Sequence, residues 1–250
     1  MASKFRSSPV TPLSRRALLI GTATLAVASC RRQRSPVTRS TGPDEFTIRH
    51  EGADVRCLFY DRLVAGDRPG CLLIVLLHGA GADATQWFDI GLVDAVDNLQ
   101  FSPDIHRLVA VAPDIANHER ASSLVVDALL PDVDHRFAPG ALAISGISRG
   151  AIGALAVARD PATAMVSVGL HSPAVRLTAP IDAAPWLCLI DVGDDDALAD
   201  ATASTASMLR ASGIDVAERH WHGGHDRPYW RAHLPDYLAF HLDAAQQSHT

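Results

Sequence analysis

Short apolar segments recur along the chain from residue 54 onward, and they alternate with segments rich in helix-forming residues. The strand-like segments are 54–61, 71–77, 107–112, 141–145, 166–170, 186–190 and 215–221. Most of them are apolar at nearly every position, which is typical of strands in a parallel sheet that helices cover on both faces. Helix-like segments follow at 86–100 in part, 122–137, 151–158, 197–212 and 229–245. This alternation predicts an α/β fold with a mostly parallel, doubly wound sheet.

The N-terminal segment has a different pattern. Its apolar run, residues 17–28, is too short to span a bilayer. Arg15 and Arg16 precede this run in a stretch that resembles a twin-arginine export signal, and Cys30 closes it in a Val-Ala-Ser-Cys pattern that resembles a bacterial lipobox. We therefore expect a signal peptide over residues 1–29, a flexible tether over 30–43 and a folded domain over 44–250.

The lipobox resemblance implies lipid attachment at Cys30 and export to the outer face of the cell membrane. A plain signal peptide with an incidental cysteine is one alternative, and a transmembrane anchor is another. Four arginines between residues 31 and 39 would also favour contact with anionic lipid headgroups.

Charge separates the N-terminal segment from the rest of the chain. The formal net charge is −6, with 22 basic and 28 acidic residues, but eight of the bases precede the first acidic residue, Asp44. The remainder has 14 bases against 28 acids. Such a surface repels phosphate backbones, so nucleic acid is excluded as a partner. The length beyond the tether suits one domain with a substantial core.

Three cysteines remain besides Cys30, and each lies in a strand-like segment. We expect Cys57, Cys71 and Cys188 to be small buried side chains, since none has the spacing of a metal site. Because an exported protein can form disulfides, pairing of Cys57 with Cys71 in consecutive strands is the alternative.

The stretch Gly146-Ile147-Ser148-Arg149-Gly150 is a Gly-x-Ser-x-Gly motif between a predicted strand and a predicted helix. This context is the one in which a sharp turn exposes a nucleophilic serine at the carboxyl edge of a sheet. The turn strains the serine backbone, and a Cβ at either glycine would collide with the neighbouring strand or helix. Ser148 is therefore the predicted nucleophile.

An oxyanion hole is predicted after the strand 71–77, where the chain reads His78-Gly79-Ala80-Gly81. Glycine lets the backbone turn an N–H group toward a substrate carbonyl. We assign the hole to the backbone N–H groups of Ala80 and Arg149, with Gly81 as the alternative donor. His78 is expected to hold the loop in place.

The acidic residue of the site is expected after the strand 186–190, where four aspartates compete. Asp191 ends the strand and is expected to brace the loop, whereas Asp196 occupies the Gly-x-x-Asp position that presents a carboxylate in many such loops. We favour Asp196, with Asp194 and Asp195 as alternatives. A calcium-binding loop is a weaker interpretation, because one short cluster supplies few ligands.

The base is expected in the loop after the last strand, because two glycines let His225 reach back over Ser148. His222 is the next candidate, and His171 is expected near the site without a role in proton transfer. A metal site formed by His222 and His225 lacks a third ligand, so we expect no metal and no cofactor. The order Ser148, Asp196, His225 is that of the α/β-hydrolases.

Four stretches together resemble the esterase D and enterochelin-esterase-like branch of the α/β-hydrolases. They are 125–134, 144–151, 193–196 and 223–226 with Trp230, and with His78-Gly79 they spread over residues 71–240. Ala151 departs from the pattern, since a further glycine is common there. The chain also has no room for a lid or an added binding domain, which argues against large substrates such as siderophores.

The resemblance implies a serine carboxylic ester hydrolase that acts on a small-molecule ester through an acyl-enzyme intermediate. An acyltransferase that passes the acyl group to a cell-envelope alcohol would use the same three residues. A surface lipoprotein that has kept the fold as a non-catalytic binding module is the third interpretation, because fold alone does not fix function.

Overall fold

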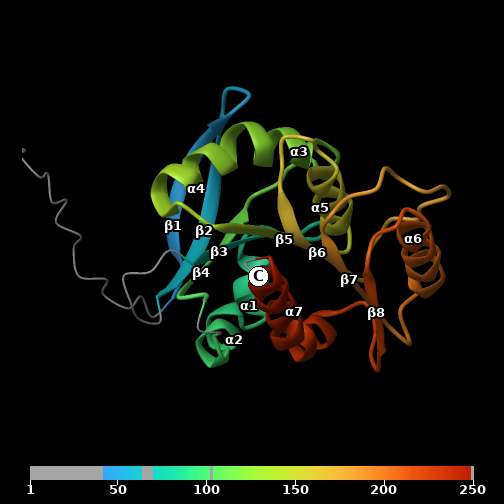
Figure 1. The fold of residues 1–250 in the computed structure, drawn as a ribbon. Helices are drawn as coiled ribbons and strands as arrows, with labels where there is room; N and C mark the ends of the chain where they lie inside the picture. Colours follow the sequence, from blue (N-terminus) through green and yellow to red (C-terminus); the bar gives the residue numbers. More distant parts are fainter. Residues whose placement is uncertain (1–41, 64–69, 102–103, 249–250) are drawn as a thin grey trace, which may run out of the picture. The chain divides into compact units, whose positions relative to one another are not determined.

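Residues 42–63, 70–101 and 104–248 are described in the computed structural model of this chain, and they form one eight-stranded sheet with helices on both faces (Figure 1). The expected signal peptide, Cys30 and most of the expected tether lie outside these residues. The strands are β1 (Asp44–His50), β2 (Ala53–Leu63), β3 (Cys71–Leu77), β4 (Arg107–Pro113), β5 (Ala141–Ile147), β6 (Met165–His171), β7 (Leu187–Gly193) and β8 (Val216–Trp221). The α-helices are α1 (Thr85–Asp89), α2 (Leu92–Asn98), α3 (Ala121–Ser123), α4 (Leu130–Phe137), α5 (Gly150–Ala158), α6 (Ala199–Ala211) and α7 (Arg227–Gln247).

The strand order across the sheet is β1-β2-β4-β3-β5-β6-β7-β8. Strand β2 pairs antiparallel with both of its neighbours, and every other pairing in this sheet is parallel. The predicted α/β fold with a mostly parallel sheet is therefore confirmed. The parallel direction matters for function, because the carboxyl ends of β3, β5, β6, β7 and β8 all lie at one edge of the sheet. The loops that follow these strands lie at the same edge.

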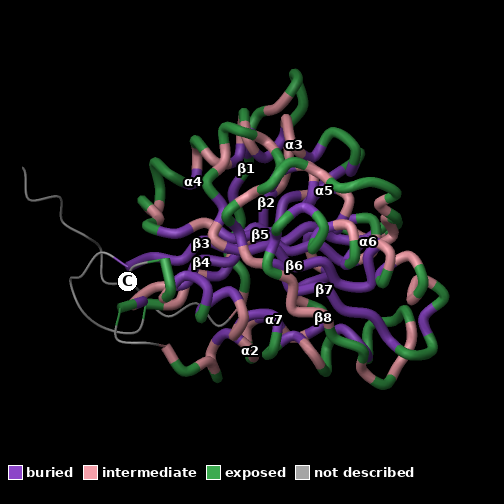
Figure 2. The backbone as a smooth tube through the Cα atoms, turned by 45° about the vertical axis from the view of Figure 1, so that its right-hand side comes forward, coloured by how far each residue is buried: buried purple, intermediate pink, exposed green. Residues whose placement is uncertain are grey.

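The sheet divides the core into two layers. Apolar side chains of α4, α5 and α6 pack on one face, whereas those of α1, α2 and α7 pack on the other. Figure 2 shows the buried strands running through the centre, with exposed residues concentrated on the surrounding helices and loops. All seven residues of β3 are buried, as its uninterrupted apolar sequence requires.

Three features differ from the sequence prediction. Strand β1 was not predicted, although Phe46 and Ile48 alternate with exposed residues along it. The helical region expected over 86–100 is divided at Gly91, which has a φ of 98°. The helix expected over 122–137 contains a π-helical segment, Leu124–Leu129, before α4. This wide turn precedes Pro131, whose nitrogen cannot donate a hydrogen bond and whose ring crowds the preceding turn.

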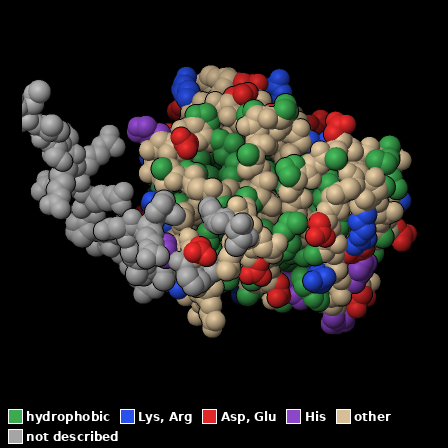
Figure 3. Space-filling view, in the orientation of Figure 1, with side chains coloured by type: hydrophobic (Ala, Val, Ile, Leu, Met, Phe, Trp, Pro, Cys, Tyr) green, Lys and Arg blue, Asp and Glu red, His purple; other side chains and the backbone are tan. Residues whose placement is uncertain are grey.

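The surface of the described residues mixes polar and apolar groups. On the face drawn in Figure 3, acidic and basic side chains are scattered between small groups of apolar ones. Within residues 42–63, 70–101 and 104–248, Leu63 is the large apolar side chain with substantial exposure, at 48%. No helix in these residues is both long enough and apolar enough to cross a membrane.

The three cysteines of the domain are free and buried. The alternative pairing of Cys57 with Cys71 is wrong, because their strands β2 and β3 follow one another in sequence but are not neighbours in this sheet. Strand β4 lies between β2 and β3, with Cys57 opposite Pro113 at one end of β4 and Cys71 opposite Arg107 at the other. Burial raises the pKa of Cys57 to about 12 and that of Cys71 to about 11, and it also raises the pKa of Cys188.

These thiols should be chemically silent in the folded protein, because the thiolate is the reactive form. In a Cys30→Ala variant, which leaves only Cys57, Cys71 and Cys188, a disulfide reagent such as dithionitrobenzoate should give no colour before denaturation. All three thiols should react once the protein is unfolded in guanidinium. Rapid reaction of any thiol in the native protein would contradict the buried, unpaired assignment.

Candidate active site

Ser148 lies at the sharp turn between β5 and α5. Its φ is +54°, in the left-handed region that side-chain-bearing residues rarely adopt. Both flanking glycines are required by close approach of the backbone. A Cβ at Gly146 would collide with the carbonyl group of Gly150, and a Cβ at Gly150 would collide with the backbone oxygens of Leu77 and His78. The turn thus has the geometry that the motif predicts.

The structure brings Ser148, His225 and Asp196 together. The Ser148 Oγ lies 2.9 Å from Nε2 of His225, and Nδ1 of the same ring lies 2.8 Å from Oδ2 of Asp196. The Asp196 side chain is only 1% exposed, whereas the His225 side chain is 35% exposed. The imidazole therefore connects a buried carboxylate to a hydroxyl that solvent can reach. With Nδ1–H donating to Asp196, Nε2 is free to accept the Ser148 proton.

The loop after β7 places its aspartates in different surroundings. Asp196 also accepts a hydrogen bond from the Leu198 N–H at 2.9 Å, which fixes the carboxylate toward His225. Asp194 is exposed and accepts the Gly223 N–H at 2.9 Å. That bond, together with His222, holds the pKa of the Asp194 carboxyl below its usual range. Asp195 is exposed, and its backbone N–H donates to the Gly223 carbonyl.

The loop that carries His225 rests directly on the loop after β7. A Cβ at Gly193 would collide with the Gly223 carbonyl, so the two glycines allow the loops to touch. The Trp230 ring packs edge-on against His225, with 5.2 Å between ring centroids. His222, the alternative base, has a side chain that is 90% exposed, and its Nδ1 lies 3.3 Å from Asp194 Oδ2. The structure therefore brings His225, not His222, to the serine.

Exposed metal-ligating groups lie beside this loop pair. Asp194, Asp195 and His222 bring one ligand atom each to within 4.8 Å of one another, and all three are exposed. Asp194 and Asp195 belong to the acidic loop for which calcium binding was the weaker interpretation. The contacts of Asp194 with His222 and with the Gly223 N–H join the two loops.

The loop after β3 lies against the serine. A Cβ at Gly79 would come within 3.5 Å of the Ser148 Cβ, so the backbone passes beside the Ser148 side chain. Neither the Ala80 N–H nor the Arg149 N–H finds a hydrogen-bond acceptor among the described residues. Gly81, the alternative donor, has a φ of +72° and forms the following turn. Both predicted donors therefore remain available to a substrate oxygen, as an oxyanion site requires.

Three buried polar side chains hold this loop, and sequence reasoning found only one of them. His78 accepts the Ile115 N–H on Nε2 at 2.9 Å, which leaves Nδ1–H to donate to the Gly79 carbonyl. Gln86 accepts the Gly79 N–H at 2.7 Å, and His118 Nε2 lies 2.6 Å from the His78 carbonyl. Burial lowers the pKa of His118. Gln86 and His118 stand in unremarkable local sequence, so no short-range signal marks them.

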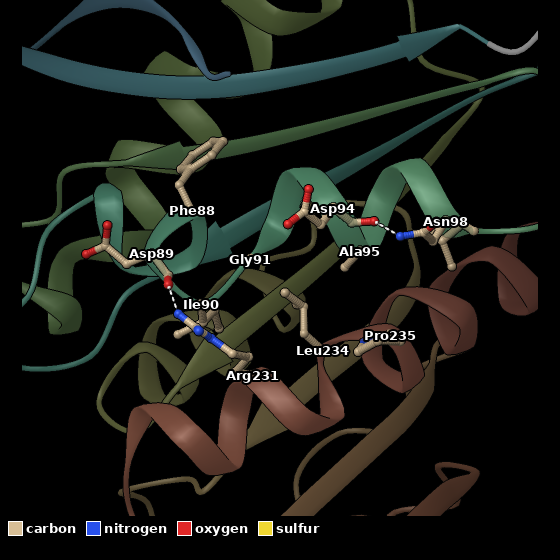
Figure 4. Close-up of a pocket in the computed structure, with 11 residues that line it drawn as sticks. Phe88, Asp89, Ile90, Gly91, Asp94, Ala95, Asn98, Arg231, Leu234 and Pro235 are labelled. Atoms are coloured by element: carbon tan, nitrogen blue, oxygen red, sulfur yellow. Dashed lines mark hydrogen bonds between the residues drawn. The ribbon is translucent and has the colours of Figure 1, made fainter. Parts of the chain in front are cut away.

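Two cavities in the described part of the chain are lined by residues other than Ser148, His225 and Asp196. One, of about 520 Å³, lies between α1, α2 and α7 (Figure 4). There the Arg231 guanidinium donates to the Asp89 carbonyl at 2.6 Å and ties α7 to the end of α1. The other, of about 470 Å³, lies beneath the π-helical segment and α4.

No protein-family model matches the chain, and no curated protein sequence matches it. Solved structures do match. A ferulic acid esterase has 18% identity and a TM-score of 0.66, over 81% of this chain and 97% of that chain. An S-formylglutathione hydrolase from Agrobacterium tumefaciens has 15% identity and a TM-score of 0.63, over 83% and 98%. An arylesterase has 13% identity and a TM-score of 0.63, over 81% and 84%. With the strand order, these likenesses show that the chain has the α/β-hydrolase fold.

The position of the acid can be tested by a matched set of substitutions. In Asp196→Asn, the amide would present N–H to His225 Nδ1, so Nε2 would carry the proton and could not accept one from Ser148. Labelling of Ser148 by a fluorophosphonate should then slow by about 10⁴-fold. Asp194→Asn keeps an oxygen for the Gly223 N–H and should label at nearly the wild-type rate, as should Asp195→Asn. Fast labelling in Asp196→Asn, with slow labelling in Asp194→Asn, would move the acid to Asp194.

Proposed function

We propose that this protein is a serine carboxylic ester hydrolase with Ser148 as nucleophile, His225 as base and Asp196 as the acid that orients it. The observation that carries the proposal is the unbroken hydrogen-bonded connection from Ser148 Oγ through His225 to Asp196, with distances of 2.9 Å and 2.8 Å. Each residue contributes a chemical capacity that acyl transfer needs. No cofactor or metal enters the proposed reaction.

The first half of the reaction forms an acyl-enzyme. Ser148 Oγ attacks the ester carbonyl carbon while its proton passes to His225 Nε2, and the buried Asp196 carboxylate stabilises the resulting imidazolium. The carbonyl oxygen becomes an oxyanion that accepts hydrogen bonds from the Ala80 and Arg149 N–H groups. Loss of one such donor costs about 3–4 kcal/mol of transition-state stabilisation in comparable enzymes. His225 then protonates the alcohol as the C–O bond breaks.

The second half releases the acid. Water enters at the partly exposed His225, which takes a proton from it as the water oxygen attacks the acyl carbon. A second oxyanion forms and collapses, the bond to Ser148 breaks, and His225 returns the proton to Ser148 Oγ. Access of water to this imidazole favours hydrolysis over transfer of the acyl group to another alcohol.

The structural neighbours support the same chemistry, since ferulic acid esterase, S-formylglutathione hydrolase and arylesterase are all hydrolases of esters or thioesters. A non-catalytic binding module would have no need for a strained serine at hydrogen-bonding distance from an oriented imidazole. The substrate we propose is a small-molecule ester.

The nucleophile is tested by Ser148→Ala. Because the acyl-enzyme requires the Ser148 hydroxyl, hydrolysis of a panel of p-nitrophenyl esters should fall by at least about 10³-fold. The control is Ser122→Ala, which removes a surface hydroxyl bonded to Asp160 and should leave the rate unchanged. A fluorophosphonate should label Ser148 in the wild type. Activity within tenfold of wild type in Ser148→Ala would overturn the assignment. Running the panel with an added alcohol reports any ester formed by acyl transfer.

We also propose that the protein is exported and anchored by lipid at Cys30, which rests on the sequence of the N-terminal segment alone. In a bacterial host with a twin-arginine pathway, the wild type should partition with membranes and Cys30→Ala should not, because each buried methylene of an acyl chain adds about 0.8 kcal/mol of membrane binding. The double substitution Arg15→Lys with Arg16→Lys should block export and leave unprocessed precursor inside the cell. A soluble wild type that begins at Met1 or Ala2 would contradict both steps.

A further inference from the structure

A second Ser-His-Asp arrangement lies buried beneath the site. Ser145 Oγ is 3.0 Å from His171 Nε2, and His171 Nδ1 is 2.6 Å from Asp191 Oδ1. The same kinds of atom connect Ser148, His225 and Asp196. Ser145, His171 and Asp191 lie in the carboxyl halves of β5, β6 and β7. We call Ser145, His171, Asp191, His241 and Ser167 the buried array.

The buried array cannot react with a substrate. Ser145 is 1% exposed, and His171 and Asp191 are fully buried. The Ser145 hydroxyl is also held on its other side, 2.7 Å from His241 Nε2, and His241 Nδ1 is 2.7 Å from Ser167 Oγ. Gly169 leaves room for the array, since a Cβ there would collide with Ser145 Oγ and lie 2.7 Å from His171 Nε2.

The hydrogens of the buried array run in one direction toward Asp191. Burial lowers the pKa of His241 to about 3, so this ring is neutral. A neutral His241 accepts the Ser167 hydroxyl on Nδ1 and donates from Nε2 to Ser145 Oγ. The Ser145 hydroxyl then donates to His171 Nε2, which leaves His171 Nδ1–H to donate to Asp191. Every ring nitrogen in the array therefore has a hydrogen-bond partner.

Asp191 also binds two tyrosine side chains of α7, the helix that carries His241. Its Oδ2 accepts the Tyr229 hydroxyl at 2.9 Å and the Tyr237 hydroxyl at 3.0 Å. Burial raises the pKa of both phenols, and the negative charge of Asp191 raises it further. Both hydroxyls therefore keep their protons and remain donors. A fully buried carboxylate thus receives three hydrogen bonds, which compensate for its removal from water.

The groups that bind Asp191 also hold the two reacting side chains. On the serine side, the His171 carbonyl accepts the Ser148 N–H at 2.8 Å, and the Ser172 N–H donates to the Asp191 carbonyl at 2.8 Å. On the histidine side, Tyr229 packs so closely under the His225 loop that a Cβ at Gly223 would lie 2.8 Å from its ring.

Trp230 links the two sides directly, because its ring contacts His225 and its Nε1–H donates to Ser172 Oγ at 3.3 Å.

We propose that Asp191 is a positioning residue that sets the distance between Ser148 and His225 by holding the elbow through His171 and the histidine loop through Tyr229. The inference rests on the proposed ester hydrolysis. It predicts that weakening the Asp191 contacts slows the chemical step while substrate binding is retained, because small displacements of reacting groups act on the rate more than on affinity.

The test is Asp191→Asn in the full chain, with kcat expressed per active serine titrated by a fluorophosphonate. This normalisation removes any loss due to unfolded protein, which a purely stabilising role would cause. We expect kcat for p-nitrophenyl acetate to fall by about 10- to 100-fold, with KM nearly unchanged. Tyr229→Phe keeps the carboxylate and the ring, removes one hydroxyl, and should lower kcat per titrated serine by a smaller factor. This milder variant decides the question if Asp191→Asn does not fold.

Ser167→Ala is the matched control, because it removes a buried hydrogen bond at the opposite end of the array. It should lower the melting temperature and leave kcat per titrated serine unchanged. If both variants fold and both keep the wild-type kcat, the positioning role is overturned and the proposed function is left intact. If Asp191→Asn does not fold, a wild-type kcat in Tyr229→Phe alone has the same consequence. A wild type that neither hydrolyses the ester nor reacts with the fluorophosphonate would overturn the proposed function and this inference together.

Discussion

The left-handed backbone of Ser148 is the constraint on which the arrangement of the site depends. A side-chain-bearing residue in this conformation costs roughly 1–2 kcal/mol, so the surroundings must hold it there. Three backbone hydrogen bonds do so: the Ser148 N–H donates to His171, and the Ser148 carbonyl accepts from Ala151 and Ala174. Because the bonds come from α5 and from the end of β6 and its following loop, the turn is fixed from several elements at once.

The fixed turn explains why glycine and burial are distributed as they are around it. Gly146 and Gly150 let β3, β5 and α5 approach at the turn, and Gly79 lets the next loop pass beside the serine side chain. Gly193 and Gly223 do the same for the loops that carry Asp196 and His225. The side chains of the site are therefore supported by backbone contacts between loops, which displace less easily than contacts between flexible side chains.

Much of this arrangement could be predicted from the sequence, because the informative signals are local. Uninterrupted apolar segments such as 71–77 marked the strands, and the fold class followed from their alternation with helices. The carboxyl edge of a parallel sheet then restricted the loops in which Ser148, Asp196 and His225 should be sought. Strand β1 was not predicted because its two buried residues, Phe46 and Ile48, lie among polar and charged neighbours.

What could not be predicted depends on residues that are distant in sequence. Cys57 and Cys71 look like neighbours along the chain, yet β4 separates their strands. The contact between Ser145 and His241 joins residues 96 positions apart, with Ser145 a single polar residue in an apolar strand and His241 one of several polar residues in α7. A lone serine or histidine in such a place is normally satisfied by a local partner, so nothing in the sequence indicates a connected array.

The two carboxylates at the end of β7 show how burial separates structural from chemical roles. Asp191 and Asp196 both accept a hydrogen bond from a histidine Nδ1, at 2.6 Å and 2.8 Å. The His171 ring is fully buried between Ser145 and Asp191, whereas the His225 ring is partly open to solvent. A proton taken by His171 could be exchanged only along the buried hydrogen bonds, but one taken by His225 can leave with an alcohol or arrive from water. Under the proposed function, the same three residue types are therefore a brace in the interior and a reactive centre at the edge of the sheet.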